Sequence, residues 1–204
     1  MPRLLELFSG TGSIGSAFRR YGWGVASVDV SKKYSPTHCV DIEEFDYKSL
    51  YVPGEIDCIW ASPPCTHYSV TRTSAKTPRD LVKADLLVRV AKRIIRFYRC
   101  PWLIENFQTG LLKGRKVVEK LRFVDTSYCK YNYPYKKATR IWHNLGDWLQ
   151  LKPMCSRATP CDVFSSNGRH AKSAQRGSGK RDGRRMKNDT LSLALLYSIP
   201  PLLC

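Results

Sequence analysis

A thiol and a carboxylic acid each follow an apolar run in this chain. Cys65 ends the segment Ser62-Pro63-Pro64-Cys65, and Glu105 comes directly after Trp102-Leu103-Ile104. A thiolate can attack an electrophilic carbon, and a carboxylic acid can donate a proton to the same substrate. The two residue types together predict covalent catalysis that is assisted by an acid.

A glycine-rich turn, Phe8-Ser9-Gly10-Thr11-Gly12, follows the apolar residues 4–7. Between a strand and a helix, such a turn lets backbone amides approach a cofactor closely. It lacks the lysine of a phosphate-binding loop. Asp29 ends the next apolar run, 17 residues beyond Gly12, where a carboxylate would meet ribose hydroxyls. The pattern predicts a dinucleotide or an adenosyl cofactor; a plain tight turn with an exposed acid is the alternative.

Two prolines hold Cys65 at a defined place, because proline fixes the backbone. The polar residues 66–69 that follow argue against a merely structural buried thiol. Ser-Pro-Pro also resembles the loop of enzymes that methylate exocyclic amines, in which an aromatic residue comes next and stacks on the base. Cysteine cannot stack but can attack, so we favour covalent catalysis over that alternative.

The chemistry requires elements that bring these segments together, and the hydrophobic pattern supplies them. Strands are predicted at 3–8, 23–28, 56–61, 102–104 and 140–143, and helices at 13–21, 79–98 and 191–197. Alternation of this kind predicts an α/β fold with a doubly wound, mostly parallel sheet. The carboxyl ends of its strands would line one ligand-binding crevice.

The composition indicates a polyanionic partner. The 204 residues include 34 Lys and Arg against 17 Asp and Glu, a net charge of +17. Such an excess over one domain favours nucleic acid, with a solvated basic surface or an anionic membrane surface as alternatives. With no long apolar run and eight scattered cysteines, we expect neither a signal peptide nor a membrane span, and reduced thiols inside a cell.

Three residues near the end of the chain could bind zinc. Cys155, Cys161 and His170, with His143 as a further candidate, are spaced more loosely than the pairs of most structural zinc sites. We therefore predict unligated thiols and no metal site. From about residue 167, basic residues alternate with Gly and Ser and leave little to bury, which is typical of a segment that is mobile until an anion orders it.

Taken in order, the segments resemble the cytosine-5 DNA methyltransferases, which use S-adenosylmethionine and have a Rossmann-like fold. The resemblance covers residues 3 to about 144 and includes Glu105-Asn106-Phe107 and a degenerate segment from Tyr131 to Arg140. Thr66 stands where the family has Gln. The resemblance implies cofactor contacts by Phe8, Ser9, Gly10, Thr11, Gly12, Asp29, Val30, Asp41, Ile42 and Pro63.

The resemblance also implies three catalytic roles. Carbon 5 of cytosine is too weak a nucleophile to accept a methyl group directly, so a thiolate must first add at carbon 6. Cys65 is predicted to be that nucleophile, Glu105 to act at ring nitrogen 3, and Arg140 to be a supporting cation. The target cytosine must leave the duplex to reach them.

Only about 45 residues separate Asn144 from Thr190, too few for the family's usual target-recognition domain. This short form resembles the small enzymes of iridoviruses and some phages. We expect one catalytic domain over 1–204, with a basic insert at 145–189. If the chain is viral, it would act in the nucleus or cytoplasm of the host cell. A transfer RNA methyltransferase and a catalytically silent nucleic-acid-binding homologue are the alternatives.

Overall fold

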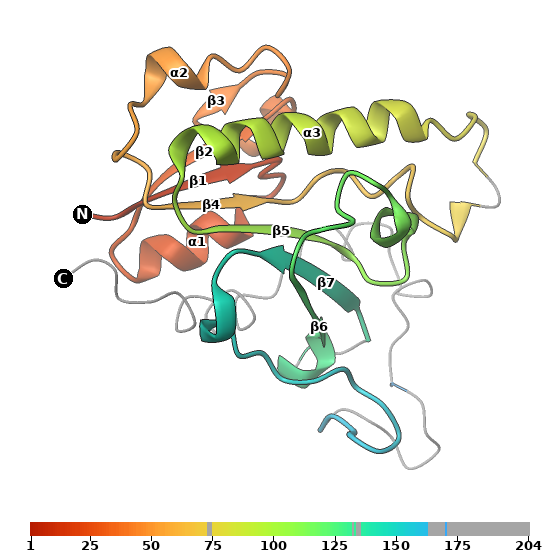
Figure 1. The fold of residues 1–204 in the computed structure, drawn as a ribbon. Coiled ribbons are helices and arrows are strands. Elements are labelled where there is room, and N and C mark those ends of the chain that lie inside the picture. Colours follow the sequence, from red (N-terminus) through yellow and green to blue (C-terminus); the bar gives the residue numbers. More distant parts are fainter. Residues whose placement is uncertain (73–74, 132, 134–135, 163–169, 171–204) are drawn as a thin grey trace.

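The computed structural model describes residues 1–72, 75–131, 133, 136–162 and 170 (Figure 1). Within them, one sheet has the strand order β3-β2-β1-β4-β5-β7-β6. Its strands are β1 (Arg3–Leu7), β2 (Gly24–Asp29), β3 (His38–Cys39), β4 (Cys58–Ala61), β5 (Trp102–Phe107), β6 (Phe123–Ser127) and β7 (Ala138–His143). The helices are α1 (Ser13–Arg20), η1 (Lys32–Tyr34), α2 (Tyr47–Leu50), α3 (Leu81–Tyr98), η3 (Leu111–Gly114), η4 (Tyr128–Tyr131) and η5 (Gly146–Trp148).

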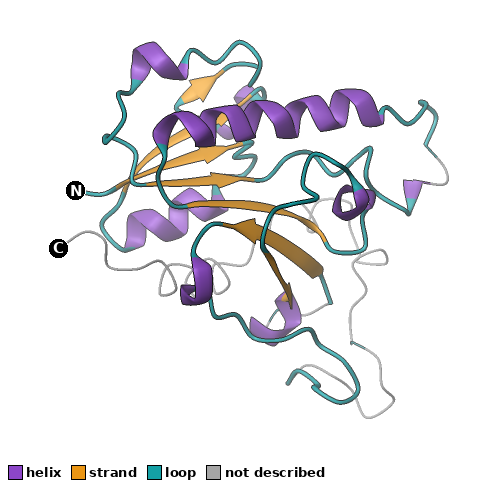
Figure 2. Ribbon diagram, viewed as in Figure 1, coloured by secondary structure: helices purple, strands orange, loops and turns teal. Residues whose placement is uncertain are grey.

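The fold is a doubly wound, mostly parallel α/β sheet, as the sequence predicted. Strands β1 to β5 pair in parallel, and only β7 runs against its neighbours β5 and β6. Helices α1 and α3 lie on opposite faces of the sheet (Figure 2). Each face has its own apolar core. Val88 and Ile94 of α3 belong to one cluster, and Ile14 and Phe18 of α1 to the other.

The longest helix follows directly from its sequence. Apolar residues recur along α3 at helical spacing, and those on one face, including Val88, Ala91 and Ile94, are buried. Asp80 caps its start by accepting a hydrogen bond from the Lys83 amide at 2.8 Å. The helix therefore begins at Leu81 rather than at the predicted residue 79. None of the helices in the described part is long and apolar enough to cross a membrane.

The sheet gathers the chemistry-bearing segments at one edge. Because β1, β4 and β5 are parallel, their carboxyl ends lie together, and the amino end of the antiparallel β7 joins them. Strand β5 ends with Glu105, Asn106 and Phe107. It is therefore three residues longer at its carboxyl end than the predicted strand 102–104. Strands β3 and β6 were not predicted. The predicted helix at 191–197 lies outside the described residues.

Candidate active site

The turn after β1 has the shape of a cofactor cradle. The Gly12 amide donates to the Ser9 carbonyl at 2.9 Å, and Gly10 and Gly12 adopt positive φ angles of 52° and 67°. Only glycine adopts this conformation readily. A Cβ atom at either position would meet no protein atom within 4 Å, so open space lies in front of the turn. The surface of the turn is therefore open to a ligand.

Asp29 fixes the conformation of this turn. Its carboxylate accepts hydrogen bonds from the amides of Gly10 and Ser31, both at 2.8 Å. The neighbouring Val30 is 71% exposed, so its side chain is accessible to a ligand. Asp41 accepts from the Glu43 amide at 3.0 Å, while Ile42 is buried. An accessible glycine turn, an acid and an exposed apolar side chain fit the sugar and base of an adenosyl cofactor.

The loop that carries Cys65 is a closed turn at the end of β4. The Cys65 carbonyl accepts from the amides of Tyr68 and Ser69 at 3.0 and 2.9 Å. The side-chain amide of Asn106 donates to the Pro63 carbonyl at 3.0 Å. This hydrogen bond joins the end of β5 to the cysteine loop. It thereby helps to fix the position of the Cys65 thiol relative to Glu105.

A buried polar network anchors the far side of this loop. The Tyr68 hydroxyl donates to Asp85 of α3 at 2.9 Å, and Arg115 donates to both oxygens of the same carboxylate. Tyr68 is fully buried and Asp85 is 4% exposed. The Tyr68 carbonyl also accepts from the Leu111 amide at 2.9 Å. Sequence reasoning did not identify this network, because its members lie on three separate segments.

Glu105 is buried in an ion pair with Lys137, the residue just before β7. The Lys137 Nζ donates to Glu105 Oε1 at 3.0 Å, and the Tyr128 hydroxyl contacts the same oxygen at 3.4 Å. Lys137 also lies over the Tyr128 ring, 4.2 Å from its centre. Burial acts to lower the pKa of Lys137, but the negative charge of Glu105 outweighs it, and the pKa is raised. Lys137 therefore stays cationic.

The pKa of the Cys65 thiol is raised in this structure. Burial is the largest cause, and the charge of Glu105 raises it further, while Lys137 lowers it in part. Basic residues near Cys65 therefore do not give it a low pKa here, because burial and the Glu105 carboxylate outweigh Lys137. The charges of Glu105 and Lys137 thus both act on Cys65, which is consistent with their positions at the same edge of the sheet.

The structure does not bring Arg140 to Glu105. Arg140 pairs across the sheet with Asn106, and Glu105 pairs with Ile141. Because successive residues of a strand face opposite sides, Arg140 and Glu105 lie on opposite faces. Arg140 donates to both oxygens of Asp125 at 2.7 Å and stacks on Phe123. The cation that pairs with Glu105 is instead Lys137, which lies within the segment from Tyr131 to Arg140 and to which the sequence analysis gave no role.

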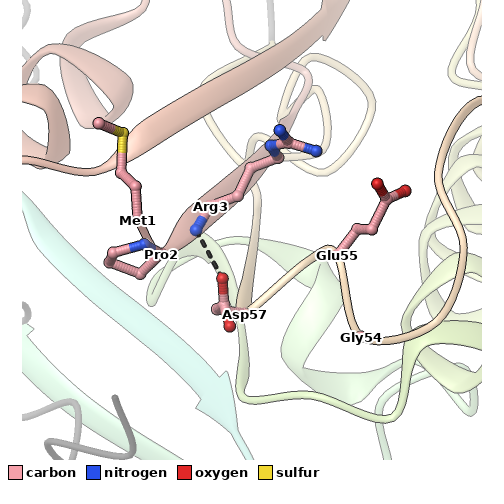
Figure 3. Close-up of a pocket in the computed structure, with 6 residues that line it drawn as sticks. All are labelled: Met1, Pro2, Arg3, Gly54, Glu55 and Asp57. Carbon is pink, nitrogen blue, oxygen red and sulfur yellow. Dashed lines mark hydrogen bonds between the residues drawn. The ribbon is translucent and has the colours of Figure 1, made fainter. Parts of the chain in front are cut away.

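Two other features lie apart from this edge. A surface pocket is lined by the N-terminal residues and the segment before β4, where Asp57 accepts from the Arg3 amide at 2.6 Å (Figure 3). It lies at the amino ends of β1 and β4, opposite the glycine turn. Cys155, Cys161 and His170 do come together, joined by Cys129, whereas His143 is not part of that group.

Comparison with solved structures shows a methyltransferase-like fold. A protein from an E. coli prophage, assigned as a DNA modification methyltransferase, superposes with a TM-score of 0.54 and is 17% identical, covering 70% of this chain and 46% of that one. The Entamoeba histolytica methyltransferase EhMeth gives a TM-score of 0.53 at 16% identity, covering 76% and 56%. The chain thus spans about half the length of both proteins.

Comparison of sequences is more specific. A frog virus 3 (isolate Goorha) protein named "Probable DNA (cytosine-5)-methyltransferase" is 32% identical over 217 residues, which span 98% of this chain and 95% of that protein. The model of the C-5 cytosine-specific DNA methylase family matches residues 2–124, a range that includes Cys65 and Glu105. This chain belongs to the family of C-5 cytosine-specific DNA methylases.

Proposed function

We propose that this chain transfers a methyl group from S-adenosylmethionine to carbon 5 of a cytosine in DNA, through a covalent adduct at Cys65. The observation that carries the proposal is the joining of Cys65, Glu105 and Lys137 at the edge that also bears the open glycine turn. A thiol, a carboxyl group and a cation within one base width are what the addition to cytosine requires.

The residues around the glycine turn fit the cofactor. When bound, S-adenosylmethionine supplies an electrophilic methyl group. The turn would hold its methionine part, Asp29 its ribose, and the exposed Val30 its adenine. The full proposed set is Phe8, Ser9, Gly10, Thr11, Gly12, Asp29, Val30, Asp41, Ile42 and Pro63.

The chain's own residues prepare the cytosine. The Cys65 thiolate forms a bond to carbon 6 while Glu105, in its acid form, gives its proton to ring nitrogen 3. The electron pair of the 5,6 double bond is then available at carbon 5. After methylation, water accepts the hydrogen at carbon 5 as a proton. The sulfur–carbon bond then breaks with its electron pair returning to sulfur, and ring nitrogen 3 gives its proton back to Glu105, so both residues are restored. Lys137 holds the Glu105 carboxyl group in place throughout.

The target cytosine would reach this site by leaving the duplex, which costs a few kcal/mol. The net charge of +17 supports binding to the phosphate backbone. We propose that residues 1–204 act as one catalytic domain in which the basic stretch 145–189 stands in place of a target-recognition domain.

The test is covalent capture on duplex DNA that contains 5-fluorocytosine, because fluorine cannot leave as the hydrogen does. With S-adenosylmethionine, the wild type and the Cys39→Ser control should give a denaturant-stable protein–DNA complex, and Cys65→Ser should give none. Capture by Cys65→Ser, or methyl groups on the exocyclic amine, would refute the role of Cys65. Capture on 5-fluorocytosine transfer RNA but not on DNA would favour the RNA enzyme. Binding without capture or methylation would favour the silent homologue.

A further inference from the structure

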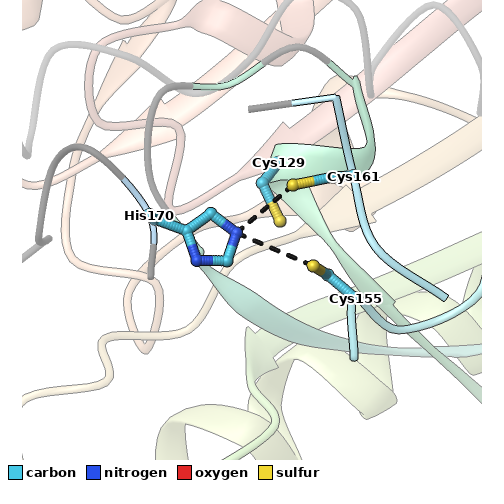
Figure 4. A group of neighbouring side chains, drawn as sticks. All are labelled: Cys129, Cys155, Cys161 and His170. Carbon is cyan, nitrogen blue, oxygen red and sulfur yellow. Dashed lines mark hydrogen bonds between the residues drawn. The ribbon is translucent and has the colours of Figure 1, made fainter. Parts of the chain in front are cut away.

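Three cysteines and a histidine from distant parts of the chain converge at η4 (Figure 4). Cys129 lies in η4, Cys155 and Cys161 follow η5, and His170 is the last residue described. Their ligand atoms, the Sγ of each cysteine and one ring nitrogen, all lie within 4.8 Å of one another. In Figure 4 the imidazole points its Nε2 toward the sulfur atoms.

The distances match the edges of a zinc tetrahedron. The His170 Nε2 lies 3.3 Å from the Sγ of Cys161 and 3.6 Å from that of Cys155. Zn–S bonds of about 2.3 Å and Zn–N bonds of about 2.0–2.1 Å give a tetrahedral S···N edge of about 3.5 Å and an S···S edge of about 3.8 Å. The two S···N distances therefore already match a tetrahedral edge, and the other pairs lie within 4.8 Å.

Burial sets these cysteines apart from an ordinary packed core. Cys129 and Cys155 are each 1% exposed and Cys161 is 7% exposed, and the three form a buried cluster of their own. Clustered thiols bury little apolar area and make only weak hydrogen bonds. A disulfide would engage only two of the three sulfur atoms. A shared metal ion satisfies all four groups.

Hydrogen bonds hold the cysteine-bearing segment against η4. The Cys155 amide donates to Ser127 Oγ at 3.1 Å, and Lys130 Nζ donates to the Pro160 carbonyl at 2.7 Å. Nearer β7, the Lys152 amide donates to the Tyr131 hydroxyl at 2.8 Å. These contacts fix the backbone on both sides of the cluster, so the sites of the sulfur atoms are organised by the fold.

We propose that Cys129, Cys155, Cys161 and His170 bind one structural zinc ion. Four protein ligands complete the tetrahedron and leave no position for water or substrate, which is the pattern of structural rather than catalytic zinc. The site would fasten the segment after β7 to η4, whose Tyr128 contacts Glu105. Spacing alone favoured unligated thiols because the fourth ligand, Cys129, lies 26 residues before Cys155.

The test is metal analysis of the full-length chain, independent of activity. Protein purified without chelator should contain one zinc per chain by plasma mass spectrometry. Replacement by Co²⁺ should give the visible bands of a tetrahedral site with thiolate charge transfer. Cys129→Ser and Cys161→Ser should lose most of the bound metal, whereas Cys39→Ser, which removes an exposed thiol outside the cluster, should retain it.

Two measurements keep the proposal falsifiable if a serine variant fails to fold. X-ray absorption of the wild type should give three sulfur ligands and one nitrogen ligand. His170→Cys should keep the metal and shift the Co²⁺ spectrum toward four thiolates. Wild-type protein that binds no stoichiometric metal after zinc loading would overturn the proposal. So would equal metal loss in Cys39→Ser, or a spectrum that His170→Cys leaves unchanged.

Discussion

The charge of Glu105 opposes thiolate formation at Cys65. As a carboxylate, Glu105 raises the pKa of the thiol beyond the larger effect of burial, and as a neutral acid it no longer does so and can donate a proton to the base. Glu105 in its acid form therefore serves both parts of the proposed addition, since it does not oppose the thiolate and it holds the proton for ring nitrogen 3. The resting site keeps the thiol neutral, and reactivity depends on where one proton resides.

Glu105→Gln should make Cys65 more reactive toward iodoacetamide while it slows methylation by roughly two to four orders of magnitude. A raised pKa keeps the thiol neutral to higher pH, so removing the Glu105 charge should shift the alkylation profile to lower pH. Alkylation of Cys65 is followed by peptide mass spectrometry across pH. An unchanged or alkaline-shifted profile would contradict this effect of the Glu105 charge, and Cys39 in the same sample is the internal control.

Lys137→Met should reduce methylation by roughly 10²–10³-fold, as the loss of one charged group at a reacting centre usually does. Lys137→Arg should restore much of the rate, because it keeps the cation beside Glu105. Arg140→Lys should act mainly on stability, since Arg140 binds Asp125 on the other face. Initial rates with tritiated S-adenosylmethionine, read with thermal unfolding, separate these cases. A greater loss in folded Arg140→Lys than in folded Lys137→Met would reverse the assignment.

At the scale of elements, the cysteine loop depends on α3 and η3 as well as on its own strand. One buried carboxylate, that of Asp85 in α3, connects the cysteine loop through Tyr68 and the end of η3 through Arg115. A buried charge that is stripped of a partner costs more than a lost hydrogen bond between neutral groups. The network should therefore show a graded response to substitution.

Asp85→Asn should lower the free energy of unfolding by about 1–3 kcal/mol, because it removes the partner of the partly exposed Arg115. Tyr68→Phe removes one hydrogen bond and should cost about 0.5–1.5 kcal/mol. Urea unfolding monitored by tryptophan fluorescence gives both values. A larger loss in Tyr68→Phe would mean that the ion pair does not anchor the loop.

The strands and helices could be predicted where the apolar residues follow one regular spacing along the sequence. The runs in β1 and β4 and the helical spacing of α3 identified the parallel sheet and its active edge. Strand β6 was missed because its sequence, Phe-Val-Asp-Thr-Ser, places charged and hydroxyl residues in a strand that pairs only with β7. Strand β3 has two residues, too few for a period.

Within the candidate site, the sequence identified residues but not their partners. Cys65 and Glu105 were recognisable from residue type and position, whereas the Lys137–Glu105 pair forms only when β7 returns beside β5. Cys129 joins Cys155 in the same way, through tertiary contact. Contacts between distant segments carry no local pattern, so they could not be predicted from spacing.

For the whole molecule, the charge of +17 should govern DNA affinity. Exposed basic side chains line the solvent face of α3 and its C-terminal cap, namely Lys83, Arg89, Arg93, Arg96 and, at the cap, Arg99. Each phosphate that a cation neutralises should contribute about 0.9 to the slope of log affinity against log salt. Fluorescence anisotropy should show a steep fall in affinity with salt, and a smaller slope for Arg93→Gln. An affinity independent of salt would contradict electrostatic binding.

The antiparallel direction of β7 also bears on how related chains are to be compared. The pairing of Phe107 with Thr139 determines where the chain returns beside Glu105. A residue inserted before Lys137 lengthens the segment between β6 and β7 but leaves the pairing of Phe107 with Thr139 intact. An insertion inside β7 would move every later side chain to the opposite face. Relatives can thus differ in length before β7 and still deliver a cation to the same carboxylate, so equivalent residues are identified by strand pairing rather than by counting.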